Sequence, residues 1–338
     1  MKKIIMFAAV AAMALVACSK VDEGVNVSTG KYTITATIGD AQTRTSYVDE
    51  TADQTKGLKV EWEANETISV VEVTAGGTYN NKYWTFTSDN VAGAKATFTA
   101  PAGFETTEGC KYIAIYPALT DGVNGPYAGV RQNNCSALLR ASTNYLEYIW
   151  VSNDDYRQTG VASMDLLKSY DVMVSAIEFN EGKADINLTK LYSVIKLDLT
   201  LPAEAAGSKI YGLSLSADKG WWPSSAAAPL SYIIDGKYQW SASDLNKQAY
   251  IRLKNSEDTD YMTVPNDCKV SIYLPCPGNK EGQFLMATKF PASSTFTITV
   301  FGAGGGSNKY SASKTMGETT TYLMQGTVNV IKATLAKE

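Results

Sequence analysis

Residues 31–38, which read KYTITATI, carry the pattern that decides the fold. Every second residue in this stretch is apolar: Tyr32, Ile34, Ala36 and Ile38. Lysine and threonine fill the positions between them. Because successive side chains of a strand point to opposite faces of a sheet, this period of two predicts a half-buried β-strand, which Gly39 and Asp40 end.

The same alternation recurs along the chain in two series, separated by the polar turn Asn180 to Lys183. In the first series, Leu58 to Trp62 and Ile68 to Val73 predict a hairpin, and Tyr112 to Tyr116 is apolar on both faces. The second series contains the runs Ile186–Leu188, Ile195–Leu201, Leu213–Ala217, Val270–Leu274 and Phe296–Val300. Short strands separated by turn residues predict an all-β chain of two tandem β-sandwich domains, residues 31–180 and 181–338.

The composition excludes several classes of function. The chain has 338 residues, with 30 basic and 34 acidic side chains and no histidine. Without histidine there is no Ser-His or Cys-His nucleophile pair and no histidine ligand for a metal. The net negative charge argues against a nucleic-acid partner. We therefore expect no catalysis, no metal and no cofactor; a hydrolase built on carboxylates alone has no support in the sequence.

The first 17 residues have the features of an export signal. Lys2 and Lys3 precede an apolar run, Ile4 to Val16, that is too short to span a bilayer. Ala17 is followed directly by Cys18, an order that resembles a bacterial lipoprotein box. We expect Cys18 to be acylated and to become the mature N-terminus, anchored in the outer membrane and followed by a polar tether, residues 18–30. The mature chain then carries 28 basic and 34 acidic residues.

Four further cysteines have spacings that match no metal motif. Cys110 and Cys135 are either a disulfide, as an oxidising envelope allows, or two small buried apolar residues. Cys268 and Cys276 flank the strand-like run Val270 to Leu274, so they cannot form a disulfide unless that strand bends.

Two other features could belong to a binding site. Trp221-Trp222-Pro223 is either an exposed platform that stacks on sugars or a loop packed against the core, and we favour the packed loop. The acidic clusters are expected to be solvated loop residues rather than a calcium or glycosidase site: Asp49-Glu50, Asp154-Asp155 and Glu257-Asp258 with Asp260.

Several short motifs resemble the fimbrillin family, the lipoprotein subunits of Bacteroidetes type V pili. After the lipoprotein box and a threonine-rich strand come Thr43 to Tyr47 and, further on, Lys59 to Val70. Asp171 to Val174 resembles the strand that closes the family's first domain, and Asn187 to Lys196 lies where the family opens its second. Many members carry a histidine in that second motif, where this chain has Lys190.

The resemblance implies two transthyretin-like β-sandwiches and assembly by strand exchange. A protease would cut between Arg44 and Thr45, and the strand with Tyr32, Ile34, Ala36 and Ile38 would leave. A neighbouring subunit would then fill the groove, and the donor residues we predict are Val328, Val330, Ile331, Ala333 and Leu335. The alternation changes phase between Val330 and Ile331, which predicts a bulge or bend there.

Two functions from different classes follow. The first is a fimbrial subunit or a pilus-associated adhesin, whose partners are other fimbrial subunits, the outer membrane through the lipid, and a ligand on a host or bacterial surface. The alternative is a surface glycan-binding lipoprotein of a polysaccharide-uptake system, in which Trp221, Trp222 and Tyr238 would stack on sugar rings.

Overall fold

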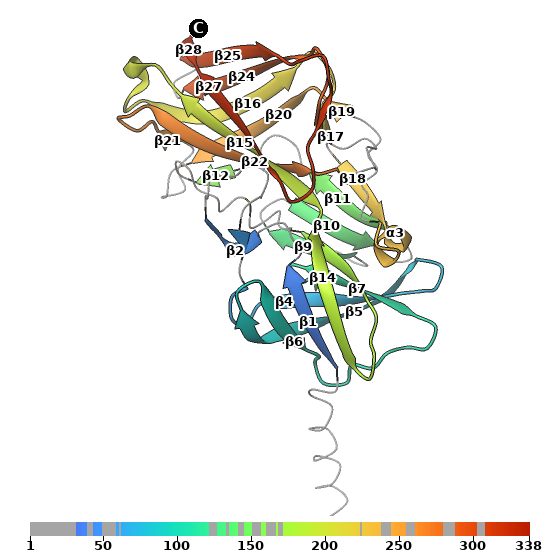
Figure 1. The fold of residues 1–338 in the computed structure, drawn as a ribbon. Coiled ribbons are helices and arrows are strands. Elements are labelled where there is room, and N and C mark those ends of the chain that lie inside the picture. The colour runs from blue at the N-terminus through green and yellow to red at the C-terminus, as the bar shows by residue number, and fades with distance from the viewer. Residues whose placement is uncertain are drawn as a thin grey trace, which may run out of the picture.

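A computed structural model gives the fold of the chain (Figure 1). It describes residues 32–38, 43–48, 59–60, 62–121, 127–132, 135–140, 145–150, 157–159, 167, 172–223, 225–237, 245–254, 261–279, 288–302 and 308–338. Almost all of these lie in strands or their connections, which confirms the all-β prediction. Within these ranges, the named helices are the one-turn segments η1 (Ala203–Ala205) and α3 (Leu230–Ile234).

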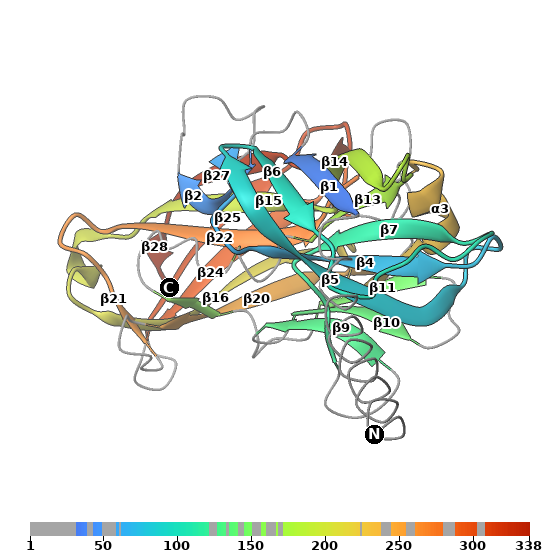
Figure 2. The same ribbon diagram turned by 90° about the horizontal axis from the view of Figure 1, so that it is seen from below.

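The first half of the chain builds a closed barrel of seven strands. Around the barrel, in order of pairing, lie β1 (Thr33–Ile38), β14 (Lys183–Lys190), β13 (Met173–Ile177), β7 (Lys111–Tyr116), β4 (Thr67–Val73), β5 (Tyr79–Ala92) and β6 (Lys95–Thr99). Figure 2 shows β1 between β6 and β14, on the side of the barrel away from β9 (Tyr127–Gln132) and β10 (Cys135–Arg140). The sheet therefore closes on itself only because β1 bridges β6 and β14.

The barrel crosses the predicted domain boundary. β14 lies after the turn at Asn180 to Lys183, which we took as the start of the second domain, yet it pairs with β1 and β13 of the first. Its alternation of exposed and buried residues, which the sequence predicts, is confirmed. A period of two shows that a strand has one buried face but not which sheet it joins.

The second half contains two main sheets. One has three strands: β22 (Lys269–Pro277), β15 (Tyr192–Thr200) and β27 (Val328–Thr334). The other runs β12 (Arg157–Thr159), β20 (Gln248–Lys254), β16 (Lys209–Ala217), β24 (Thr295–Gly302), β25 (Lys309–Thr315) and β28 (Ala336–Lys337), with β21 (Met262–Thr263) also paired to β16. Apolar residues of both sheets meet in one core, as in a sandwich.

The remaining strands form smaller sheets. Five strands pair in the order β18 (Ser225–Pro229), β11 (Tyr145–Trp150), β10, β9 and β8 (Thr120–Asp121). Three pairs complete the fold: β17 (Trp222–Pro223) with β19 (Leu245–Asn246), β23 (Lys289–Phe290) with β26 (Thr321–Tyr322), and β2 (Thr43–Val48) with β3 (Lys59–Val60). The hairpin predicted between Leu58–Trp62 and Ile68–Val73 is wrong, because β3 pairs with β2 whereas β4 pairs with β5 and β7.

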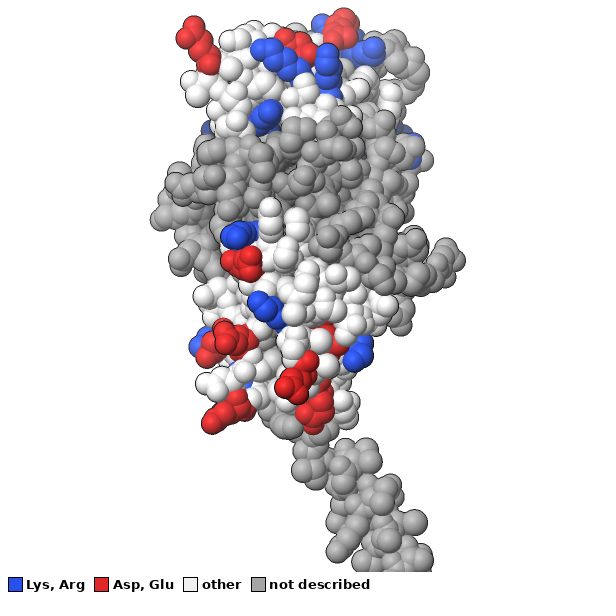
Figure 3. Space-filling view, turned by 90° about the vertical axis from the view of Figure 1, so that its right-hand side faces the viewer, with Lys and Arg blue, Asp and Glu red and all other residues white. Residues whose placement is uncertain are grey.

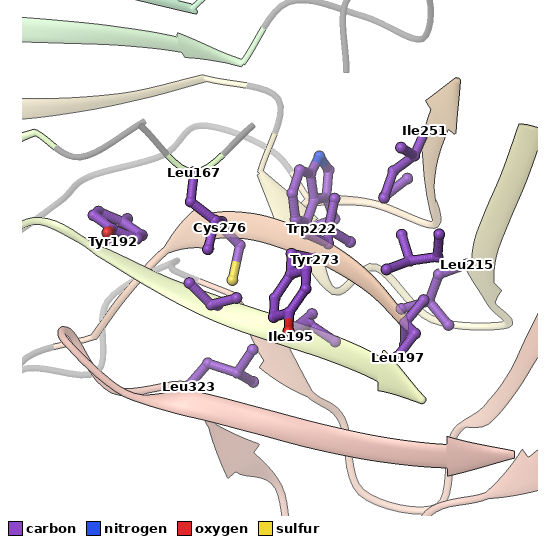
Figure 4. Close-up of a cluster of buried hydrophobic side chains, with 14 of the residues drawn as sticks. Leu167, Tyr192, Ile195, Leu197, Leu215, Trp222, Ile251, Tyr273, Cys276 and Leu323 are labelled. Atoms are coloured by element: carbon purple, nitrogen blue, oxygen red, sulfur yellow. The ribbon is translucent and has the colours of Figure 1, made fainter. Parts of the chain in front are cut away.

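Two hydrophobic cores hold these sheets. The smaller fills the barrel and includes Ile34, Phe86 and Phe98. The larger fills the second half, where Ile195, Tyr273 and Trp222 pack together (Figure 4). It also takes in Val71 of β4, Ile113 of β7 and Leu230 of α3, so the outer face of the barrel wall belongs to it. The larger core therefore extends from the second half onto the outer face of the barrel.

Candidate functional site

The strand β1 is the most unusual element of the barrel, because it comes first in the described chain yet has a neighbour on each side. It runs parallel to β14, with Ile34 opposite Ala184 and Ala36 opposite Ile186. On its other side it runs antiparallel to β6. Its burial alternates strictly, which confirms the half-buried strand predicted from the sequence.

The inner face of β1 fills a row of pockets of unequal size. Ile34 and Ala36 are completely buried, and Ile38 is nearly so. Ile34 lies opposite Phe98, while Ala36 lies opposite Ala96. Ala36 and Ala96 are neighbours on the inner face, and Ala36 is completely buried, so in a close-packed interior the surrounding side chains already fill the space beneath it. The pockets at residues 34, 36 and 38 therefore accept large, small and large side chains in that order.

One end of this row is closed by an aromatic cluster around Phe104. The rings of Tyr32 and Phe104 lie edge to face with centroids 5.0 Å apart, and Tyr32 meets Phe179 at 5.3 Å in the same manner. Phe86 and Tyr112 contact Phe104 from the barrel interior. Phe104 is 2% exposed. The cluster seals this end of the barrel against water.

The Tyr32 hydroxyl connects β1 to the loop that carries Phe104. It donates a hydrogen bond to a carboxylate oxygen of Glu105 at 3.3 Å and lies 3.2 Å from the hydroxyl of Thr106. The start of β1 is thus held by ring contacts and by polar contacts to the same loop.

A buried carboxylate anchors that loop from the other side. Glu72 of β4 accepts hydrogen bonds from Thr107 Oγ1 at 2.7 Å, from the Tyr112 hydroxyl at 3.3 Å and from Asn80. The ammonium group of Lys82 lies 3.4 Å from the same carboxylate. Burial by itself raises the pKa of Glu72, but the hydrogen bonds from Thr107 and Asn80 and the charge of Lys82 together lower it below its usual value.

Neither Phe104 nor Glu72 was predicted from the sequence as part of a site. Phe104 is an aromatic residue within the polar loop Pro101 to Cys110, and Glu72 is an acidic residue within the otherwise apolar end of β4. Each breaks the local pattern, which is the signal that could have identified them. A buried glutamate needs donors, and a large apolar residue in a polar loop needs a pocket.

The opposite end of the row is closed by Trp62. It is 4% exposed, and its ring meets Phe98 and Tyr116 edge to face, at 5.0 and 5.2 Å. Aromatic caps at both ends fix the length of the groove that β1 occupies, from Tyr32 to Ile38.

The predicted cleavage point, between Arg44 and Thr45, lies within β2. The polar composition of residues 39–46 does not predict this strand. The pairing of β2 is slight, because only Thr43 with Val60 and Val48 with Lys59 are in register, and the register shifts between them. The side chains of Arg44 and Thr45 lie outside the part of the chain that the structure describes.

The predicted donor residues lie in and just after β27. This strand has one neighbour, β15, to which it runs parallel, so it forms an edge of its sheet. Val328 and Leu335 are buried, whereas Val330, Ile331 and Ala333 are half-buried. The bulge predicted between Val330 and Ile331 is wrong, because the register with β15 continues unbroken from Val328 to Thr334. The chain changes sheet at Leu335, after which β28 pairs with β25.

A single path through the molecule relates β1 to β27. Only Leu191 separates β14 from β15, and Figure 1 shows the two strands as one continuous line from the barrel into the second half. β1 runs parallel to the first part of that line, and β27 runs parallel to the second. The first strand and the last long strand therefore point in the same direction.

Lys190, within the motif Asn187 to Lys196, lies at the end of β14. It is buried, and its ammonium group donates a hydrogen bond of 2.7 Å to the Tyr192 hydroxyl. It therefore joins the barrel strand to the first residue of β15.

The described ends of the molecule differ in charge, as Figure 3 shows for one face. Acidic residues dominate the barrel end: Glu105, Glu108, Glu178, Glu181 and Asp185, with Lys111 and Lys183 among them. The end where the chain terminates carries both signs of charge, with somewhat more lysines than acids: Lys209, Lys269, Lys309, Lys332 and Lys337 with Glu204, Asp267 and Glu338.

The cysteines are thiols in the part of the chain that the structure describes. Cys110 is free and half-buried, and Cys135 has its side chain outside the described residues. Burial raises the pKa of the Cys110 thiol, and the nearby charge of Glu72 raises it further. Cys268, just before β22, and Cys276, near its end, are free and buried, as the length of the strand predicts. Complete burial raises the pKa of Cys276 to about 12.

The sugar-stacking site is not supported. Trp221 and Trp222 are buried, and the Trp221 indole donates a hydrogen bond of 2.9 Å to the backbone carbonyl of Lys247. Both rings pack into the larger core, which confirms the packed loop that we favoured. Tyr238 and the acidic clusters at 49–50, 154–155 and 257–260 lie outside the described residues. So does Cys18.

Among the described residues, acidic and cysteine side chains form no group that could hold a metal ion. No helix in the described ranges is long and apolar enough to cross a membrane.

Solved structures similar to this chain include proteins from several Bacteroides species. One is a candidate cell adhesion protein from Bacteroides ovatus, 11% identical, with a TM-score of 0.47 over 92% of this chain and 96% of that one. A candidate cell adhesion protein from Bacteroides uniformis is 13% identical, with a TM-score of 0.40 over 91% and 96%. A fimbrial protein from Bacteroides vulgatus is 11% identical, with a TM-score of 0.34 over 80% and 91%. No protein-family model and no curated protein matches the sequence.

Proposed function

We propose that this protein is a lipid-anchored surface subunit, either a fimbrial subunit or a pilus-associated adhesin, that assembles head to tail by exchange of a β-strand. The observation that carries the proposal is the place of β1. It is the first described strand of the chain, and it alone joins β6 to β14. A cut after it would leave a groove with backbone hydrogen-bonding groups on both flanks and an apolar floor.

The release step would begin at Arg44. Cleavage between Arg44 and Thr45 detaches the lipid-bearing segment from Cys18 to Arg44, and β1 belongs to that segment. Because β2 makes few ladder contacts with β3, a protease that binds its substrate as an extended strand can take this segment in place of β3. Until the cut, the lipid on Cys18 would hold the subunit at the outer membrane.

The replacement step would use the C-terminal strand of another copy. Within its own subunit, β27 forms a hydrogen-bonded ladder with one neighbouring strand, β15, and buries few side chains. In the groove it would have a ladder on both sides and an apolar row beneath it. At about 1.5–3 kcal/mol for each large apolar side chain, three or four inserted residues give roughly 5–10 kcal/mol before ordering costs.

The charges at the two ends of the molecule are compatible with head-to-tail contacts in a filament. The acidic barrel end and the C-terminal end lie at opposite extremes of an elongated chain (Figures 1 and 3). A contact between two different surfaces of identical subunits repeats without closing, unless a rotation closes it into a ring. A contact between two barrel ends would bring acidic surfaces together, so the charges favour contact of a barrel end with a C-terminal end.

The release and exchange steps are tested together with purified protein that starts at Ser19 and an arginine-specific protease. We expect a new N-terminus at Thr45 and a ladder of multimers in SDS electrophoresis without boiling. Arg44→Lys is the matched control, since it keeps the charge and removes the cut. Absence of a cut at Arg44, or a ladder that persists after deletion of 328–338, would contradict the mechanism.

The anchor has its own test in the full precursor. Cys18→Ala should move the protein from the detergent phase to the aqueous phase in a phase-partition assay. A variant that still partitions with detergent would show that the lipid is not on Cys18.

A further inference from the structure

We infer that the incoming C-terminal strand keeps the direction of β1 and that Ile331, Ala333 and Leu335 take the places of Ile34, Ala36 and Ile38. This inference rests on the proposed strand exchange and specifies its geometry. It assigns one of the two faces of the last strand to the groove and assigns the other face to solvent.

The first argument is the order of side-chain sizes. The groove accepts a large, a small and a large residue at positions 34, 36 and 38, because Ala36 is completely buried beside Ala96. Ile331, Ala333 and Leu335 have the same order and the same spacing of two residues. The β1 residues between the pockets, Thr33, Thr35 and Thr37, are half-buried, and Lys332 and Thr334 suit such positions.

The second argument excludes the other face of the strand. That face carries Val328, Val330, Lys332 and Thr334. If this face entered the groove, Lys332 would follow Val330 on the buried side of the strand. Its ammonium group would then lie inside the barrel. The groove interior around Ile34 and Ala36 is fully buried and apolar, so a charge there would lack a partner. A slip by one residue is therefore prevented.

The third argument concerns direction, because the large-small-large order reads the same both ways. β1 and β27 point the same way along the line of β14 and β15. Subunits that are stacked in one orientation along the long axis would therefore present the donor strand already aligned with β1. A reversed strand would have to come from the Ile38 end of the groove, where the recipient's own second half lies (Figure 1).

The inferred pairing predicts specific neighbours across the ladder. Thr35 lies opposite Thr97 and Thr37 lies opposite Lys95 in the antiparallel pair of β1 and β6. In the exchanged state, Lys332 replaces Thr35 and so faces Thr97. A reversed strand with Ala333 in the same pocket would place Thr334 opposite Thr97 instead. A single substituted position therefore distinguishes the two directions.

The experiment uses two double variants, Lys332→Cys with Thr97→Cys and Thr334→Cys with Thr97→Cys, each cut at Arg44 and then oxidised mildly. We expect disulfide-linked multimers in boiled, non-reducing gels for the Lys332 pair and none for the Thr334 pair. The single-cysteine variants and the parent chain control for the native thiols. The uncut Lys332 pair controls for links that need no exchange.

The outcomes separate this inference from the proposed function. Multimers that form in unboiled gels but link only through the Thr334 pair would overturn the direction. Multimers that link through neither pair would overturn the register. Absence of multimers from the cut parent chain would overturn the proposed function and this inference with it. As a second readout, Ile331→Glu should abolish the ladder while Val330→Glu keeps it, provided that both variants give parent-like circular dichroism.

Discussion

The ring of Tyr32 meets the ring of Phe104 edge to face, and the Tyr32 hydroxyl reaches Glu105 in the same loop. The start of the first strand is thereby held by an aromatic contact and by polar contacts at one point. A strand that must stay in place until it is cut needs such a fastening, since the ends of strands fray first.

Tyr32→Ala should lower the free energy of unfolding by about 3–5 kcal/mol, as truncation of a buried aromatic residue does. Tyr32→Phe is the matched control: it keeps the ring contacts and loses only the polar contacts, at a cost of about 1 kcal/mol. Urea denaturation followed by circular dichroism measures both. Equal losses for the two variants would show that the hydroxyl, rather than the ring, fastens the strand.

Glu72 should make the protein sensitive to acid. Because its pKa in the folded state is lowered, its contribution to stability is fully present above the unfolded-state pKa of about 4.5 and is lost as the pH falls through the folded-state pKa. We expect Glu72→Gln to reduce the fall in stability between neutral pH and acid. Urea midpoints measured across that pH range test this, with Glu63→Gln, an exposed residue, as the control.

The alternation of buried and exposed residues predicted β1, β14 and β24 correctly, because a strand with one wet face must have a period of two. What it could not predict is which strands pair. β14 looks like the start of a second domain in sequence, yet pairing over a long separation places it beside β1. The same limit applies to β3, whose partner is β2 rather than the adjacent β4.

The parts of the site that the sequence did not predict depend on contacts between distant residues. Phe104 closes the barrel because Tyr32, Trp84 and Phe179 converge on it, and no local pattern encodes that convergence. The bulge predicted at Val330 failed for a related reason. The phase change accompanies half-buried residues on both faces of this edge strand, and no extra residue interrupts its ladder.

Trp222→Ala should destabilise the second half without any effect on glycan binding. The side chain is 4% exposed and packs in the larger core, so its truncation should cost about 3–5 kcal/mol. Affinity electrophoresis in polysaccharide gels should show no retardation of the parent chain. If the parent chain were retarded, and a folded Trp222→Ala variant were not, the glycan-binding alternative would be supported again.

The two native thiols that differ in burial should react differently. Cys276 is fully buried with its pKa raised to about 12, whereas Cys110 is half-buried. Because the thiolate is the reactive form, an alkylating reagent should modify Cys276 only after unfolding and Cys110 first in the native protein. Mass spectrometry of peptides after timed alkylation measures this order. A native Cys110 that resists the reagent but reacts after reduction would show that it is in a disulfide.

Ala36 allows the energetics of strand exchange to be separated from the energetics of the barrel. Ala36→Leu should overpack the narrow pocket opposite Ala96 and weaken the hold on β1 by about 1–3 kcal/mol. The substitution leaves with β1 after the cut at Arg44, so the groove and the donor strand of the assembled state are those of the parent. Multimers should therefore form faster than in the parent and be equally stable to heat in SDS. Ala96→Leu is the matched comparison, because it narrows the same pocket from the wall and stays behind. It should weaken β1 and the donor strand alike, and its multimers should dissociate at a lower temperature. If Ala36→Leu also lowered that temperature, β1 would still occupy the groove in the multimers, and strand exchange would not be the mode of assembly.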